Sequence, residues 1–168
     1  RRFITIAAAA AGLGVLPARA RAAASAAYTW RAVTLGANAS VTLIHGMSRP
    51  IGALFHVPHG LSNAMLLAEV TAWSVAHARA RYAHCARYMG VATDADSDEI
   101  GGTKLVEALR ALLVDLRVPG PQAYGIARSD WFDSLQLMAD QALASGSPAN
   151  NPRVPVAGEI VSLYQRIW

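Results

Sequence analysis

The sequence predicts a mainly α-helical protein, an irregular bundle of successive helices. Hydrophobic residues make up 54% of its 168 residues, and aromatic residues make up only 7%. Alanine dominates the apolar content, which favours packed helices over β-strands. Leucines recur at helical spacing between residues 105 and 116, and Pro/Gly-rich breaks at 119–121 and 147–152 separate helical segments. The pattern therefore argues against an all-β fold.

Residues 1–27 have the anatomy of a targeting segment. Two arginines precede an apolar run over residues 3–16, which is followed by Pro17 and a small-residue sequence ending at Ala20. This order resembles a twin-arginine export leader. The run is shorter than the roughly 20 apolar residues that a spanning helix needs, so no stable membrane span is expected. The alternative to a leader is a buried alanine-rich helix. If the leader works, the protein would be exported to the periplasm.

Residues 28–44 are rich in β-branched and aromatic side chains and predict one or two short strands around Gly36 and Asn38. The pattern W-R-x-V-x-L-G-A-x-A-S-x-T-L, which begins at Trp30, resembles the start of an exported FAD:protein FMN transferase. It contains none of that family's flavin or magnesium residues. We therefore expect a short β-like segment between the leader helix and a helical domain over residues 45–168.

The helical domain opens with two histidines, His45 and His59. Pro58 is well placed to start a helix that holds His59 in its first turn. Histidines on consecutive helices joined by a tight loop can face one point, as neutral imidazoles do at a metal. Their spacing alone leaves core or surface roles open. His56 is a candidate third ligand, although a capping or lining role is favoured because Pro58 interrupts the helical i, i+3 geometry.

From His59 onward the domain is expected to form five helices, and the helices after the first carry no strong site of their own. Gly101 and Gly102 are expected to open the third helix. The sequence has a single cysteine, Cys85, which excludes an internal disulfide and a thiolate zinc site. Cys85 should pack as an apolar residue. His77 and His84 are expected on a solvated face. The expected helices span residues 59–78, 79–89, 103–116, 129–144 and 156–167.

The net charge of +4 does not indicate a nucleic-acid partner. The first carboxylate of the chain is Glu69, so the basic excess lies in the N-terminal part and the remainder is slightly acidic. The acidic run at 94–99 fails as a calcium loop, because Glu99 stands where the turn needs glycine and Leu105 stands where a bidentate glutamate belongs. We expect a solvated linker that brings negative charge to the start of the next helix.

The segment HGMSRPIGALFHVPHGLSNAMLLAEV, residues 45–70, closely resembles the metal-ligand segment HGMxHxxGxxxxxPHGxxNA of iron-containing (group III) alcohol dehydrogenases. The resemblance continues to the end of the chain. It implies the C-terminal helical domain of that family, with His45 and His59 as ligands of Fe(II) or Zn(II). It also implies hydride transfer between NAD(P) and a small alcohol or aldehyde, in a protein that works in the cytoplasm and can form a homo-oligomer.

The sequence departs from that family in two ways. Arg49 stands where many members have a second histidine; arginine cannot relay protons, but it can contact a substrate carboxylate or a cofactor phosphate. The family's D-x-x-x-H ligand pair is also missing, because all five histidines precede the first aspartate, Asp94, and no GxGxxG string occurs. We therefore expect loose metal binding and no NAD held by this chain alone.

Three functions remain open from the sequence. The first is a metal-dependent alcohol dehydrogenase domain that is inactive without the family's other half. The second is a remnant of an exported flavin-transferase-like protein, and the third is a non-catalytic helical module for metal binding or protein interaction. An export leader joined to half of a nicotinamide-dependent enzyme indicates a composite reading frame.

Overall fold

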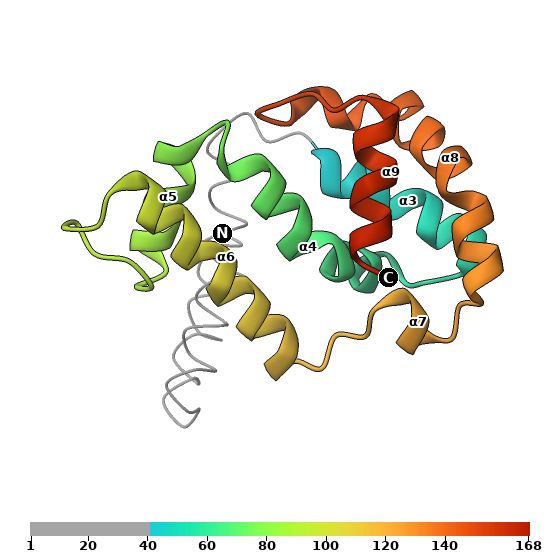
Figure 1. Ribbon diagram of the computed structural model, residues 1–168, viewed down its shortest axis with the longest axis horizontal. Helices are drawn as coiled ribbons and strands as arrows, with labels where there is room; N and C mark the ends of the chain where they lie inside the picture. Colours follow the sequence, from blue (N-terminus) through green and yellow to red (C-terminus); the bar gives the residue numbers. More distant parts are fainter. Residues whose placement is uncertain (1–40) are drawn as a thin grey trace, which may run out of the picture.

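The computed structural model describes residues 41–168; the predicted leader and nearly all of the predicted β-like segment lie outside the described residues. Every regular element from residue 41 onward is helical, which confirms the mainly α fold (Figure 1). No helix in this range is long and apolar enough to span a membrane. The elements are α3 (Leu43–Phe55), α4 (His59–Val75), α5 (Arg79–Tyr88), α6 (Asp98–Asp115), α7 (Pro121–Tyr124), α8 (Arg128–Ala144), the 3-10 helix η2 (Ser147–Asn150) and α9 (Ala157–Arg166).

Two packed groups of helices meet along α4. Helix α3 packs against α4, α8 and η2, and α8 packs against α9, whereas α5 and α6 pack on each other and α6 reaches α4. Figure 1 shows α5 at one end of the molecule and α8 at the other, with α4 between them. The second group has its own small core, in which Cys85 is buried as predicted and packs with Leu105 and Leu109.

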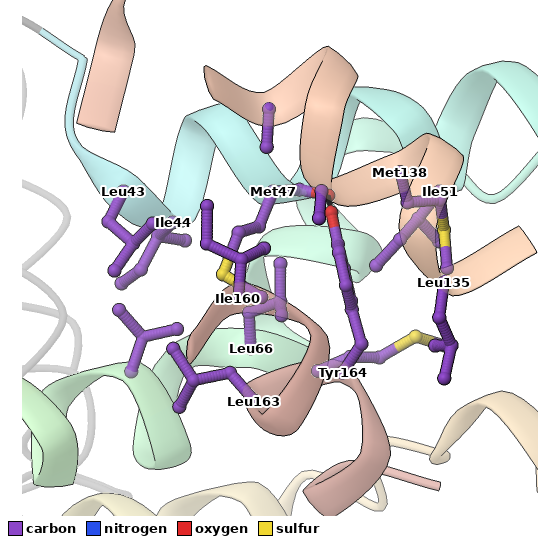
Figure 2. Packing of buried hydrophobic residues seen from close by; sticks show 14 of the residues in the cluster. Leu43, Ile44, Met47, Ile51, Leu66, Leu135, Met138, Ile160, Leu163 and Tyr164 are labelled. Atoms are coloured by element: carbon purple, nitrogen blue, oxygen red, sulfur yellow. Dashed lines mark hydrogen bonds between the residues drawn. The ribbon is translucent and has the colours of Figure 1, made fainter. Parts of the chain in front are cut away.

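The larger core buries one face of α3. Leu43, Met47 and Ile51 recur every four residues, and all three are fully buried. Figure 2 shows these side chains packed with residues of α4, α8 and α9, and the Tyr164 ring extending from α9 toward α3. The Tyr164 hydroxyl donates a hydrogen bond of 2.7 Å to the Met47 carbonyl oxygen, and burial raises the pKa of Tyr164. The orientation of α3 is therefore set by its apolar face.

Helix α3 begins at Leu43, two residues before the boundary predicted from the sequence. The last two residues of the expected β-like segment, Leu43 and Ile44, are therefore helical. Both side chains are buried in the larger core, where they continue the apolar face of α3. Tertiary burial has overridden the β propensity of this stretch.

Gly101 and Gly102 do not open a helix, contrary to the sequence prediction. Helix α6 begins at Asp98, and Ser97 caps it by accepting a hydrogen bond from the Ile100 amide. A Cβ atom on Gly101 would lie 2.9 Å from the Ala83 Cβ atom, and one on Gly102 would lie 2.6 Å from Val75 Cγ1. The glycine pair therefore allows α6 to approach α5 and the end of α4 closely.

The other boundaries agree with the sequence to within a few residues. Helices α4, α5, α8 and α9 lie where they were predicted. The short helix α7 begins at the last residue of the first predicted Pro/Gly break, and η2 lies inside the second. His77 and His84 are exposed, as expected. Asp98 and Glu99 occupy the first turn of α6, so the acidic run does bring negative charge to a helix start.

Part of the acidic run also ties α6 to the loop before it. Lys104 donates hydrogen bonds of 2.8 and 2.9 Å to the two carboxylate oxygens of Asp96, and Thr93 donates to the same carboxylate through its backbone amide. These bonds lower the pKa of Asp96 from 3.8 to about 2. Arg87 pairs with Asp98 at 3.1 Å and joins α5 to the start of α6.

Replacing Gly101 by alanine should destabilise the protein. The added methyl group meets Ala83 Cβ and also the Ala83 Cα atom at 3.1 Å, and backbone cannot move away cheaply. We expect a loss of about 1–3 kcal/mol in the free energy of unfolding, measured by urea denaturation. Gly158→Ala in α9 is the matched control, because nothing lies within 4 Å of its added Cβ atom. An equal loss in both variants would contradict the close-approach role of Gly101.

The Asp96 bonds should make the fold sensitive to acid. Because folding lowers the pKa of Asp96, its stabilising contribution is complete above about pH 4 and is lost as the pH falls toward 2. Urea denaturation across this range should show a smaller loss of stability in Asp96→Asn than in the wild type. The control is Asp133→Asn, at an exposed residue of α8. Parallel pH profiles for wild type and Asp96→Asn would reject this account.

Candidate metal centre

The structure brings the two predicted metal-binding histidines together. Helix α3 ends at Phe55, His56 and a buried Val57 follow, and α4 begins immediately after Pro58, so His59 lies in its first turn as predicted. The centroids of the His45 and His59 rings lie 5.7 Å apart, with an angle of 45° between the ring planes. One short loop thus places two imidazoles from consecutive helices next to each other.

Ser48 and Asn63 hold the His59 ring from both sides. The Ser48 hydroxyl donates to the His45 carbonyl oxygen at 3.1 Å and lies 3.4 Å from His59 Nδ1. The hydroxyl proton is therefore engaged, so the Ser48 oxygen can only accept a hydrogen bond from Nδ1–H of His59. Asn63 Nδ2 donates to His59 Nε2 at 3.1 Å. The network thus favours the tautomer with hydrogen on Nδ1 and the lone pair on Nε2.

The His45 ring is held in its neutral form and has an unused nitrogen. Burial lowers the pKa of His45, and the charges of His59 and Arg49 lower it further. The Nδ1 atom of His45 is buried and has no hydrogen-bond partner. The Oδ1 atom of Asn63 is also buried and has no partner. Buried polar atoms are usually paired, so these two atoms are available to a ligand or a water molecule. Neutral imidazole is the form that binds metal ions.

These donors fit half of a metal site. Imidazole nitrogens suit Fe(II) and Zn(II), and zinc usually takes four ligands at about 2.0–2.3 Å. Within residues 41–168, no three His, Cys, Asp or Glu side chains gather closely enough to hold an ion. Residues 1–40 contain none of these residue types. The imidazole pair therefore supplies two of the four ligands of a tetrahedral shell.

His56 does not join the pair. It is exposed and caps the C-terminus of α3 in the left-handed conformation, with φ of 54°. Its carbonyl oxygen lies 3.5 Å from the Tyr124 hydroxyl. The capping role favoured from the sequence is confirmed, and the alternative of a third ligand is wrong because the αL turn directs the chain into Pro58.

Arg49 lies one helical turn after His45 on α3 and is exposed. It contributes to the lowered pKa of His45, so the two side chains are electrostatically coupled. None of the ion pairs in the described part of the chain includes Arg49. A guanidinium group therefore stands free beside the imidazole pair.

Sequence reasoning did not identify Ser48 and Asn63 as functional residues. A helical spacing could have shown both, because Ser48 follows His45 by three residues and Asn63 follows His59 by four. The contact from Ser48 to His59 crosses between helices and has no signal in the local sequence.

Comparison with known proteins gives one consistent family. Residues 9–168 match the model of the Fe-containing alcohol dehydrogenase family, C-terminal. Lactaldehyde reductase of Escherichia coli (strain K12) is 33% identical over 132 residues, which cover 78% of this chain and 34% of that protein. The 1,3-propanediol dehydrogenase of Citrobacter freundii is 28% identical over 132 residues, covering 78% of this chain and 33% of its own.

Solved structures agree in fold. The crystal structure of a 1,3-propanediol oxidoreductase superposes with a TM-score of 0.71 at 26% identity, over 77% of this chain and 33% of that one. The alcohol dehydrogenase from Oenococcus oeni gives a TM-score of 0.70 at 28% identity, over 78% and 33% of the two chains. The chain spans about a third of the length of the relatives it matches.

Removing the Ser48 hydroxyl should release the His59 ring. In Ser48→Ala, we expect the bias of His59 toward the Nδ1–H tautomer to weaken, because the acceptor for that hydrogen is gone while the Asn63 bond to Nε2 remains. Long-range ¹H–¹⁵N NMR spectra of the neutral imidazole distinguish the two tautomers. Ser162→Ala, which changes an exposed serine of α9, should leave the His59 signals unchanged. An unchanged tautomer in Ser48→Ala would show that Ser48 does not orient the ring.

Proposed function

The chain belongs to the iron-containing alcohol dehydrogenase family, and on this premise we propose that it supplies the metal-side domain of an NAD(P)-dependent alcohol dehydrogenase. The observation that carries the proposal is the facing pair of imidazoles, His45 and His59, with a buried ring nitrogen left without a partner. The substrate class is small alcohols and aldehydes. The names of the relatives support this, since they act on lactaldehyde, 1,3-propanediol and butanol.

A bound divalent metal supplies Lewis-acid polarisation of the alcohol or carbonyl oxygen, and a nicotinamide supplies the hydride chemistry. This chain's residues do the positioning. His45 and His59 would hold the metal through neutral nitrogens, and Ser48 keeps the lone pair of His59 on Nε2. Asn63 presently bonds to Nε2 and would move aside when a metal binds. A guanidinium group does not serve as a general base, so Arg49 does not take the proton of the alcohol.

The remaining donors and the nucleotide-binding surface belong, on this proposal, to the other two thirds of such an enzyme. The chain covers 34% of the Escherichia coli lactaldehyde reductase, and two imidazoles satisfy only half of a four-coordinate ion. The domain therefore holds metal weakly by itself and gains activity only when joined to the rest of the catalytic machinery.

The purified chain should bind Zn(II), or Fe(II) under anaerobic conditions, weakly and at one site. Isothermal titration calorimetry should show that His59→Ala reduces binding to background. His77→Ala is the matched control, because it removes an exposed imidazole at the far end of the same helical region. Circular dichroism should show that both variants stay folded, since neither residue is buried.

Two results would contradict this proposal in different ways. Zinc binding that survives His59→Ala but is lost in His77→Ala would place the metal elsewhere. Robust NAD(P)-dependent oxidation of propane-1,3-diol by the purified chain would show that no further donors are needed. A third outcome is that zinc binds at His45 and His59, but the chain stays inactive when it is supplemented with the remaining parts of a family enzyme. This outcome would favour the non-catalytic module.

A further inference from the structure

Asn63 occupies the ring nitrogen of His59 that a metal ion would need. The two residues lie four positions apart on α4, so their side chains share one face of the helix. Asn63 Nδ2 lies 3.1 Å from His59 Nε2, and the NH2 group of an amide can only donate. His59 Nε2 therefore accepts this hydrogen bond through its lone pair, and the helix itself places the amide against the ring.

The other nitrogen of the His59 ring offers no second lone pair. The Ser48 hydroxyl donates to the His45 carbonyl oxygen, so its oxygen accepts a hydrogen bond from His59 Nδ1–H, over 3.4 Å. A neutral imidazole with hydrogen on Nδ1 has one lone pair, and it lies on Nε2. That lone pair serves one partner at a time, either the Asn63 amide or a metal ion. A metal ion that binds His59 must therefore break the Asn63 bond.

The cost of displacing Asn63 is that of one hydrogen bond. Within residues 41–168, the bond to His59 is the only hydrogen bond of the Asn63 side chain, because its Oδ1 atom is buried without a partner. The bond is exposed, as is the His59 side chain, so an ion from solvent can reach Nε2. Water replaces a broken hydrogen bond, so the net cost corresponds to about two- to tenfold in a binding constant.

We propose that Asn63 is a placeholder for the metal: it holds the His59 lone pair in the metal-free chain, competes with the ion for it, and so lowers the affinity of the site. The inference rests on the proposed function and adds a residue that acts on the metal through His59. On binding, the bond from Asn63 Nδ2–H to Nε2 breaks and a bond from Nε2 to the metal forms. The amide keeps its hydrogens and His59 keeps its Nδ1–H, so neither side chain releases a proton.

The test measures Zn(II) affinity in the full chain and in Asn63→Ala by isothermal titration calorimetry. We expect Asn63→Ala to bind Zn(II) about two- to tenfold more tightly, because the competing donor is gone. Alanine is the best helix former, and circular dichroism should show that the variant stays folded. Gln165→Ala is the matched control, since it removes an exposed amide from α9 and should leave the affinity unchanged. Unchanged or weaker binding in Asn63→Ala, or an equal gain in Gln165→Ala, would overturn the proposal.

A second measurement follows the amide itself. The side-chain NH2 signals of Asn63 in ¹H–¹⁵N NMR spectra are identified by their disappearance in Asn63→Ala. They should shift when Zn(II) is added to the wild type, and they should shift in the same direction in metal-free His59→Ala, because both changes remove the acceptor of the amide. Asn63 signals that respond to neither change would show that the amide does not hold Nε2 and would reject the placeholder.

The double variant His59→Ala/Asn63→Ala separates this inference from the proposed function. Its zinc binding should fall to background, as in His59→Ala alone, and a gain that survives in it would overturn the proposal by placing the ion elsewhere. Zinc binding that His59→Ala abolishes, with no gain in Asn63→Ala, would reject the placeholder and leave the proposed function standing. Zinc binding at background in both the wild type and Asn63→Ala would reject the metal site and the placeholder together.

Discussion

Burial of one face of α3 is the constraint on which the rest of the structure depends. Leu43, Met47 and Ile51 are fully buried, and the Tyr164 hydroxyl from α9 bonds to the Met47 carbonyl oxygen. With that face buried, the rotation of the helix about its axis is set. His45 and Arg49 are then directed away from the core, and both remain partly or fully accessible. The packing of α3 thus determines the geometry of the site.

The site itself combines neutral donors with a neighbouring positive charge. Burial and the neighbouring charges keep His45 neutral, and Ser48 and Asn63 together define which nitrogen of His59 carries the lone pair. The absence of acidic side chains before Glu69 means that nothing on α3 or in the preceding sequence opposes Arg49. His45 and Arg49 therefore lie on adjacent turns of α3, and His59 lies in the first turn of α4.

The second group of helices supports the site from a distance. Gly101 and Gly102 let α6 pack closely on Ala83 of α5 and Val75 of α4, while Lys104 binds Asp96 at the entry to α6. Helix α4 contributes to both cores, with Leu66 and Val70 in the larger core and Ala68 in the smaller one. The helix that begins at His59 is thus packed on both sides.

The sequence by itself determined the helical class, most helix positions, the start of α4 after Pro58 and the burial of Cys85. These features follow from composition, local periodicity and proline geometry, which act over a few residues. Only the tertiary structure decided that α3 begins at Leu43, because this start depends on burial in a core built from distant helices. The start of α6 at Asp98 has a local cause, the Ser97 cap, and the tertiary structure decided that Gly101 and Gly102 pack against α5 and α4. It also decided the 5.7 Å approach of His45 to His59 and the link from Ser48 to the second ring. Such contacts cross between helices, and a crossing angle leaves no periodic signal in the sequence.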